Sequence, residues 1–257
     1  GREKILERLP QIRELAIDFE GVDPIEEPIP VRPTAHYSMG GIDADKLGRT
    51  PIKGLYAIGE CACISVHGAN RLGGNSLLDI VVFGKIAGED AVNYVSEVSF
   101  LNFGESEVET ERERIEKLFN GDGSEKLHQL RSELSDAMSR GVGIFREEKK
   151  MREALEKVRE IKERAENLKV YDREKSFNTN LQQTLEFLNM VEVAETIAFS
   201  AIERRESRGA HYRTDYPKRD DENFLKHSIV KRSEDGELSI SWKPVTITKF
   251  QPEERKY

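Results

Sequence analysis

The sequence has no long apolar run and no excess of basic residues. No stretch reaches the roughly 18 consecutive apolar residues that a membrane-spanning helix needs. The 257 residues carry a formal net charge of -8, which argues against a nucleic-acid phosphate backbone as the main ligand. We therefore expect a soluble protein that binds no nucleic acid and meets a membrane only through a partner.

Cysteine is also scarce. The two cysteines, Cys61 and Cys63, are too close along the chain for an ordinary disulfide, because a bridge needs a particular Cα separation and side-chain direction. They have no second cysteine pair or histidine cluster nearby, so no metal site is predicted. We expect a reducing compartment, in which both thiols act as small buried apolar groups.

The glycine-rich segment at residues 65–74 lacks both common phosphate-binding patterns. It has neither the GxGxxG of a dinucleotide loop nor the lysine that ends a P-loop. It instead places Arg71 among three glycines, directly before a helix predicted over residues 76–95, with Asn75 or Ser76 as the N-cap. The backbone N–H groups of the glycines and of the helix start would bind an electron-rich ligand.

Arg71 is the candidate for gripping a small organic acid. Its planar guanidinium can bind a carboxylate through two hydrogen bonds, and the neighbouring glycines leave it accessible. His36 lies just before its own glycine pair and is a second donor candidate, and two such donors suit a dicarboxylate. The alternative stays open, because a loop arginine is more often solvated or salt-bridged and a lone histidine is more often structural.

Proline and glycine mark the secondary structure of the first hundred residues. Residues 1–21 have helical apolar spacing, and Pro10 separates them into two short helices. Gly40 and Gly41 predict a tight turn or a close approach of another backbone. The segment GLYAIG at residues 54–59 is typical of a short buried strand.

The predicted helix over residues 76–95 is apolar on nearly every face. We expect a helix of this kind to be buried. Gly84 and Gly88 are four residues apart and would form a strip of small residues along which another backbone or a flat ligand can approach.

The remaining sequence predicts a helical bundle and a small β-structured tail. Apolar stripes within residues 107–206 indicate two or three long packed helices, which Gly141 and Gly143 could interrupt. Residues 238–242 and 245–248 alternate like two short strands. The predicted fold class is therefore α+β.

Three segments resemble the flavoprotein subunit of succinate dehydrogenase and fumarate reductase. They are HYSMGG at residues 36–41, GLYAIGECACISVHGANRLGGNSLLDIVVFG at residues 54–84 and ESRGAHYRTDYPKRDDENFLKH at residues 206–227. The resemblance extends over nearly the whole chain. It implies the end of a capping domain (1–30), the carboxyl-terminal part of an FAD-binding domain with a strand and a buried helix (31–100), a helical bundle domain (101–206) and a tail with short strands (207–257).

The resemblance implies FAD as the cofactor and assigns residues to it. Glu60 matches the acid that binds the cofactor after the last strand of the FAD-binding domain. Ser76 and Leu77 match the pair at the helix start that touches the isoalloxazine ring, and Asn75 is placed with them.

The resemblance also implies that His36 and Arg71 are the catalytic residues, which hold the two carboxylates of the substrate. His67 lies near the same site in a supporting role. The implied reaction is hydride transfer between a carbon of succinate or fumarate and FAD, with electrons passing to an iron-sulfur partner subunit. Such a protein meets its membrane anchor only through partner subunits, so the expected location is cytoplasmic, at the inner face of the cell membrane.

The sequence departs from the family pattern in the region that would precede His36. The family's GxGxxG turn, the histidine that is often linked covalently to the flavin and the arginine that shuttles protons are not recognisable. The chain is therefore expected to be the carboxyl-terminal portion of the subunit and to be inactive alone. Two alternatives stay open: an enzyme like L-aspartate oxidase, which shares the flavin fold, and a helical interaction module.

Overall fold

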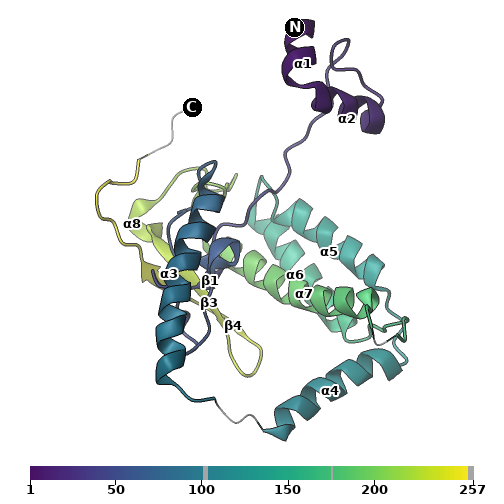
Figure 1. The fold of residues 1–257 in the computed structure, drawn as a ribbon, viewed down its shortest axis with the longest axis vertical. Helices are drawn as coiled ribbons and strands as arrows, with labels where there is room; N and C mark the ends of the chain where they lie inside the picture. Colours follow the sequence, from purple (N-terminus) through teal and green to yellow (C-terminus); the bar gives the residue numbers. More distant parts are fainter. Residues whose placement is uncertain (101–103, 175, 254–257) are drawn as a thin grey trace. The chain divides into compact units, whose positions relative to one another are not determined.

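Helices predominate in the computed structural model, which describes residues 1–100, 104–174 and 176–253 (Figure 1). The chain divides into two units, residues 1–38 and residues 39–257. The start of the predicted bundle domain at residue 101 and the end of the predicted tail at residues 254–257 lie outside the described residues.

The first unit contains the two short helices that the sequence predicts. Helix α1 spans Arg2–Arg8 and α2 spans Pro10–Glu20. The proline occupies the first turn of α2, where a missing N–H group removes no intrahelical hydrogen bond. An ion pair of 2.7 Å between Arg13 and Asp23 then holds the chain against α2 as it leaves the helix.

The second unit begins with a short parallel pair of strands. Strand β1 (Ile42–Asp43) pairs with β2 (Ala62–Cys63). Gly41 precedes β1 with φ of 129°, and a Cβ atom there would overlap the backbone carbonyl of Cys61. The predicted close backbone approach at this glycine pair is therefore confirmed.

The prediction of a strand at residues 54–59 is wrong. Tyr56 forms a single antiparallel bridge with Arg49, and the chain then turns into the short 3-10 helix η1 (Gly59–Cys61). The apolar pattern correctly indicates burial, since Ala57 is 3% exposed. A strand also requires an extended neighbour, which the pattern cannot specify.

Helix α3 (Asn75–Glu97) confirms the predicted helix but corrects its predicted burial. Within the described residues, Asp79 and Ala87 are the only residues that α3 buries. The segments that pack against α3 are short, namely η1 and the turn at Gly48. A Cβ atom at Gly48 would lie 3.0 Å from Cβ of Ala87, so the chain approaches α3 closely at this alanine. At the predicted strip itself, among the residues that the structure describes, a Cβ atom at Gly88 would meet nothing within 4 Å and one at Gly84 would meet only the side chain of Ile58. The exposed apolar residues of α3 are Leu77, Leu78, Ile80, Val81, Val82, Val92 and Val95.

The predicted helical bundle is confirmed. Its helices are α4 (Glu105–Asn120), α5 (Leu127–Gly141), α6 (Glu148–Ala165) and α7 (Thr179–Glu203). Helix α6 packs against both α5 and α7 (Figure 1). The main core includes Leu130, Leu134, Val158, Ile161, Phe187 and Val191.

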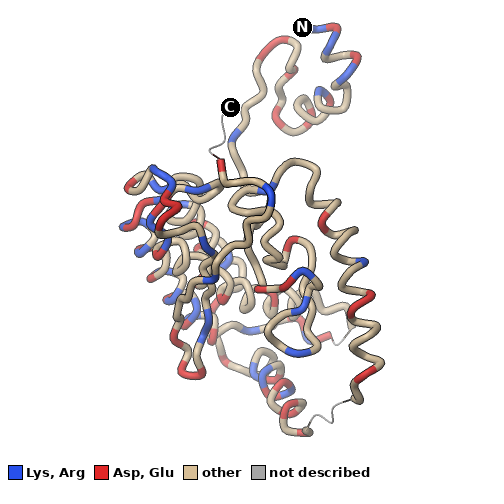
Figure 2. The backbone as a smooth tube through the Cα atoms, turned by 90° about the vertical axis from the view of Figure 1, so that its left-hand side faces the viewer, with Lys and Arg blue, Asp and Glu red and all other residues tan. Residues whose placement is uncertain are grey.

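Gly141 ends α5, as its position in the apolar stripe predicts. A Cβ atom at this position would overlap the side chain of Ala154 on α6, so the two helices approach closely here. Charged residues of both signs are interspersed along the chain (Figure 2). Among the described residues, no helix has both the length and the apolarity to cross a membrane.

The carboxyl-terminal tail forms one antiparallel hairpin after a single helical turn, α8 (Asp221–Phe224). Strand β3 (Lys226–Arg232) pairs with β4 (Leu238–Pro244). The strand predicted at residues 245–248 is wrong, because β4 ends at the proline and the chain then has no strand partner. The charged sequence KHSIVKR conceals β3, which the alternation pattern missed.

Candidate functional site

Residues 65–74, the Arg71 loop, are held at two points on their amino-terminal side. Ser65 has φ of 77°, and its Oγ lies 2.7 Å from Nε2 of His227 on β3. His67 Nε2 lies 3.0 Å from Oδ2 of Asp79 on α3, which is a hydrogen-bond distance. The side chain of Asp79 is 4% exposed. The loop is thus tied both to the tail and to the helix that follows it.

A third contact fixes the loop backbone two residues before Arg71. The N–H of Ala210 donates a hydrogen bond of 2.9 Å to the carbonyl of Ala69. Gly209, in the left-handed region with φ of 57°, approaches the same carbonyl so closely that a Cβ atom there would overlap it. We call residues 207–211 the tail segment.

The guanidinium of Arg71 lies at the start of α3. Its Nη1 donates to the carbonyl of Leu72 at 3.1 Å, and the N–H of Asn75 donates to the same oxygen at 3.2 Å. The N-cap is Gly74, in the left-handed region, and no side chain caps the helix. The prediction of Asn75 or Ser76 as the cap is therefore wrong, because the glycine adopts the turn into the helix that a capping side chain would otherwise stabilise.

The start of α3 has the properties of a surface for a flat cofactor. Leu77 is 71% exposed and Leu78 is 61% exposed, so they present apolar area beside the uncapped helix end. Cβ positions at Gly73 and Gly74 have no other atom within 4 Å. Apolar area next to a helix start without a side-chain cap fits an aromatic ring system with polar edges, as in a flavin.

The remaining predicted site residues fall in different places. Glu60 is exposed in η1, and Ser76 is half-buried in the first turn of α3. His36 is exposed and belongs to the first unit, whereas Arg71 belongs to the second. The pairing of His36 with Arg71 around one substrate stays a prediction.

The two cysteines are both free, but the prediction that both are buried is wrong. Cys61 is exposed at the end of η1, and its thiol lies 3.3 Å from the carbonyl of Ile58. Cys63 is half-buried in β2, and burial raises the pKa of its thiol. The two cysteines differ in exposure because Cys61 ends η1 whereas Cys63 lies in β2.

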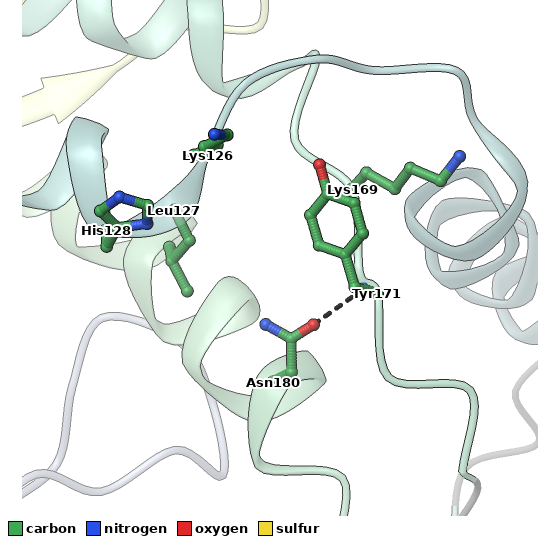
Figure 3. A pocket seen from close by; sticks show the side chains of 6 residues that line it. All are labelled: Lys126, Leu127, His128, Lys169, Tyr171 and Asn180. Atoms are coloured by element: carbon green, nitrogen blue, oxygen red, sulfur yellow. Dashed lines mark hydrogen bonds between the residues drawn. The ribbon is translucent and has the colours of Figure 1, made fainter.

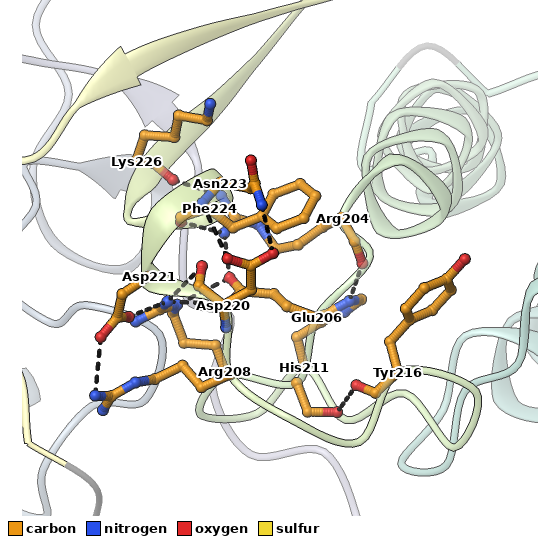
Figure 4. A network of polar contacts seen from close by, with 12 residues as sticks. Arg204, Glu206, Arg208, His211, Tyr216, Asp220, Asp221, Asn223, Phe224 and Lys226 are labelled. Atoms are coloured by element: carbon orange, nitrogen blue, oxygen red, sulfur yellow. Dashed lines mark hydrogen bonds and ion pairs between the residues drawn. The ribbon is translucent and has the colours of Figure 1, made fainter.

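A buried carboxylate organises the polar tail, which the sequence pattern did not reveal. Glu206 is fully buried and accepts hydrogen bonds from Arg204 at 2.6 Å, from Arg208 at 2.8 Å and from the N–H of Asp220 at 3.0 Å (Figure 4). Arg208 also contacts Asp221 at 2.6 Å. The alternation of arginine, glutamate and arginine was the available signal, because a buried charge requires such partners.

His211 closes the tail segment as a neutral imidazole. Its Nδ1 lies 2.7 Å from Nη1 of Arg146, and its Nε2 lies 2.9 Å from the carbonyl of Arg204. A guanidinium only donates, so Nδ1 accepts and Nε2 carries the hydrogen. Burial and, to a smaller extent, the positive charges of the neighbouring arginines together lower the pKa of His211 to about 4.

A surface hollow of about 350 Å³ lies elsewhere, at the starts of α5 and α7 (Figure 3). Its lining residues are Lys126, Leu127, His128, Lys169, Tyr171 and Asn180. None of them is a predicted site residue. The predicted site is instead an open surface at the start of α3, and the hollow is separate from it.

Comparisons with known proteins agree with the resemblance seen in the sequence. Residues 131–257 match the family profile described as fumarate reductase flavoprotein C-term, and residues 1–77 match that of an FAD binding domain. The fumarate reductase flavoprotein subunit of Haemophilus influenzae is 46% identical over 261 residues, covering 100% of this chain and 43% of the relative. The chain therefore spans less than half the length of this relative, and FAD is confirmed as the cofactor of the matching family.

Solved structures show the same relationship. A mutant of Escherichia coli quinol fumarate reductase FrdA has a TM-score of 0.93 and 44% identity, covering 99% of this chain and 44% of that chain. The Mycobacterium smegmatis Sdh1 complex has a TM-score of 0.86 and 35% identity, covering 95% of this chain and 42% of that chain. The α+β fold class is thereby confirmed. From its motifs, its fold and these matches, the chain belongs to the family of succinate dehydrogenase and fumarate reductase flavoprotein subunits, of which it is a carboxyl-terminal portion.

Proposed function

We propose that the whole protein carrying this chain interconverts succinate and fumarate with FAD as its cofactor. The observation that carries this proposal is the carbonyl of Leu72, which accepts hydrogen bonds from both the Arg71 guanidinium and the N–H of Asn75. An arginine suited to a carboxylate therefore lies beside a helix start suited to a flavin.

Arg71 and His36 would bind the two carboxylates of the substrate. Arg71 offers a planar pair of donors to one carboxylate, and His36 offers a donor to the other. Holding both ends orients the reacting carbon–hydrogen bond, and such positioning can contribute roughly 7–11 kcal/mol to lowering a barrier. In the reducing direction, the same donors stabilise the negative charge that develops next to a carboxylate.

Four residues would hold the cofactor. Asn75 would offer its side-chain amide and Ser76 its backbone N–H group in the first turn of α3. Leu77 presents exposed apolar area, and Glu60 would offer a carboxylate acceptor from η1. When bound, FAD supplies the two-electron hydride chemistry that protein side chains lack. The contribution of this chain is to bind the two reactants and to keep them at one surface.

The domain assignment and the partners belong to the same proposal. We infer that residues 1–30 end a capping domain, 31–100 end the FAD-binding domain, 101–206 form the bundle domain and 207–257 form the tail. Electrons would pass to an iron-sulfur subunit and would reach a membrane anchor only through it, at the inner face of the cell membrane. The similarity to a quinol fumarate reductase and to an Sdh1 complex supports this inference.

An Arg71→Lys substitution in the whole protein tests the function. An ammonium cannot make the two-pronged contact, so we expect FAD to be retained while kcat/KM for succinate and fumarate falls by about 100-fold, which corresponds to about 2.7 kcal/mol. Arg140→Lys, at an exposed position on α5, is the matched control and should leave the kinetics unchanged.

The outcomes separate the alternatives. Unchanged dicarboxylate kinetics in Arg71→Lys would contradict the role given to Arg71. Oxidation of L-aspartate in preference to succinate would instead favour an enzyme like L-aspartate oxidase. A whole protein that binds no dicarboxylate, while the bundle helices α4–α7 capture a partner, would favour the interaction module.

A further inference from the structure

We propose that Gly209 and Ala210 are positioning residues for Arg71, through which the carboxyl-terminal tail sets the geometry of the substrate site. This inference rests on the proposed function, since it assumes that Arg71 binds a carboxylate. It assigns a role in substrate binding to two small residues that are distant from Arg71 in the sequence and have no reactive side chain.

The contact between the tail segment and the Arg71 loop is a backbone contact that only glycine permits. Gly209 has φ of 57°, and a Cβ atom there would lie 2.5 Å from the carbonyl carbon of Ala69 and 2.7 Å from its Cβ. Atoms at such distances repel, so a larger residue would displace one of the two segments. The hydrogen bond from Ala210 N–H to the Ala69 carbonyl, 2.9 Å long, fixes the register of the contact.

The tail segment is the less movable of the two. Arg208 and His211 exchange backbone hydrogen bonds of 2.8 Å and 3.0 Å, which closes a tight turn around Gly209. His211 is held between Arg146 and the carbonyl of Arg204. Arg208 is held by the fully buried Glu206 (Figure 4). Displacing this segment would break several charged hydrogen bonds, so the loop is the part that shifts.

A shift of Ala69 would reach Arg71 directly. The loop is fixed at Ala69 by the tail and at Leu72 by the start of α3, and Arg71 lies between these two points. Two further contacts, Ser65 with His227 and His67 with Asp79, limit how the preceding residues could absorb the shift. The guanidinium is therefore placed by a short segment that is held at both ends.

A Gly209→Ala substitution in the whole protein tests this positioning, with Gly236→Ala as its matched control. Gly236 has φ of 88° in the turn between β3 and β4, and a Cβ atom there would have no neighbour within 4 Å. Both substitutions introduce left-handed backbone strain, but only Gly209→Ala introduces the contact with Ala69. We expect Gly209→Ala to raise KM for succinate and fumarate by about 10-fold with FAD content unchanged, because a small misplacement of a binding group weakens its contact steeply. Gly236→Ala should leave KM unchanged.

A readout that does not depend on activity accompanies the kinetics. Trypsin cleaves after arginine, so the rate of cutting at Arg71 reports how firmly the loop is held. We expect faster cutting in Gly209→Ala than in Gly236→Ala. Equal KM values and equal cutting rates in the two variants would overturn the inference, and loss of FAD together with kcat would show a general structural role instead of a positioning one.

The experiment also separates failure of this inference from failure of the proposed function. If the unaltered protein turns over neither dicarboxylate, the proposed function fails, and the tryptic rates alone decide whether the tail holds the loop. If Gly209→Ala yields no folded protein, Ser65→Ala replaces it, since this change removes only the hydroxyl that contacts His227. We expect Ser65→Ala to raise KM and the tryptic rate in the same direction, and no change in either would overturn the inference.

Discussion

The bundle helices and α3 are both rich in apolar residues, yet they satisfy them in different ways. Helices α5, α6 and α7 bury Leu130, Val158 and Phe187 completely against one another. Helix α3 leaves Leu77 and Val81 exposed, at 71% and 69%. The bundle helices thus bury one another's apolar residues, whereas α3 presents an exposed apolar surface suited to binding another protein surface or a ligand.

The difference shows that apolar content alone does not tell where a buried surface will be completed. Large exposed apolar areas mark binding or association sites in most proteins. For α3 this agrees with the coverage of the relatives, since the chain spans only 44% of the FrdA chain that it matches. The bundle is stabilised by a core formed within this chain, whereas most of the large apolar residues of α3 stay exposed in the described part of the chain.

The strongest test of this contrast is to express residues 1–257 alone. We expect the purified chain to show the helical signal and cooperative unfolding of the bundle, but to retain no FAD and to oxidise no succinate, because α3 and the Arg71 loop offer only one side of a cofactor site. Visible flavin absorbance and a succinate assay measure both outcomes. Stoichiometric bound flavin with turnover would remove the contrast.

Truncating one large apolar residue in each region should give unequal losses of stability. Phe187→Ala in the bundle should lower the free energy of unfolding by about 3–5 kcal/mol, because it leaves a cavity in a fully buried core. Leu77→Ala at the start of α3 should change it by less than about 0.5 kcal/mol, as at most exposed positions. Urea unfolding of the chain compares the two, and equal losses would show that α3 is packed in solution.

His211 should make stability depend on pH in the tail that holds the Arg71 loop. Its pKa is lowered to about 4 in the folded state, so between the ordinary value of 6.5 and 4 the unfolded chain binds more protons. The contribution of His211 to the free energy of unfolding is therefore fully present above pH 6.5 and is lost as the pH falls towards 4. At pH 5 the loss amounts to about 2 kcal/mol.

A histidine substitution isolates this contribution. His211→Gln should reduce the loss of stability between pH 7 and pH 5, whereas His128→Gln, at an exposed position on α5, should leave that loss unchanged. Urea unfolding at the two pH values measures both. An identical pH dependence in the His211 variant and the unaltered chain would contradict the assignment of a neutral buried imidazole.

The smallest expected effect concerns the helix starts. The side chain of Asn178 caps α7 by accepting the N–H of Leu181 at 2.7 Å, whereas no side chain caps α3. Asn178→Ala should therefore cost about 1 kcal/mol of stability. Asn93→Ala, at an exposed position within α3, should cost nothing measurable. Thermal unfolding of both variants tests the difference, and an equal effect would mean that the cap contributes little.

The sequence predicts the helices well because their signals are local. Pro10 separates α1 from α2, and Gly141 ends α5, each for a steric reason that belongs to the residue itself. The strands are predicted poorly, because β3 has a charged sequence and depends on its pairing with β4. Pairing is a long-range property that alternation within one segment does not contain.

The candidate site is divided in the same way. The sequence indicates Arg71 beside a helix start. In the structure, its guanidinium donates a hydrogen bond to the carbonyl of Leu72, which also accepts one from the N–H of Asn75. It does not indicate that Ala210 holds Ala69, because residues so far apart are brought together only by the folded tail. The position of Arg71 beside a helix start could therefore be predicted from the sequence, whereas the contact that holds its loop could be found only in the folded structure.

The backbone link between Ala69 and Ala210 also has a consequence for biosynthesis. Ribosomes add roughly 5–20 residues per second, so the loop leaves the ribosome on the order of ten seconds before the glycine and alanine that fix it. During that interval the nascent loop lacks its final restraint, although the helix behind it can already form. The loop that carries Arg71 therefore reaches its final geometry only after the tail segment has left the ribosome.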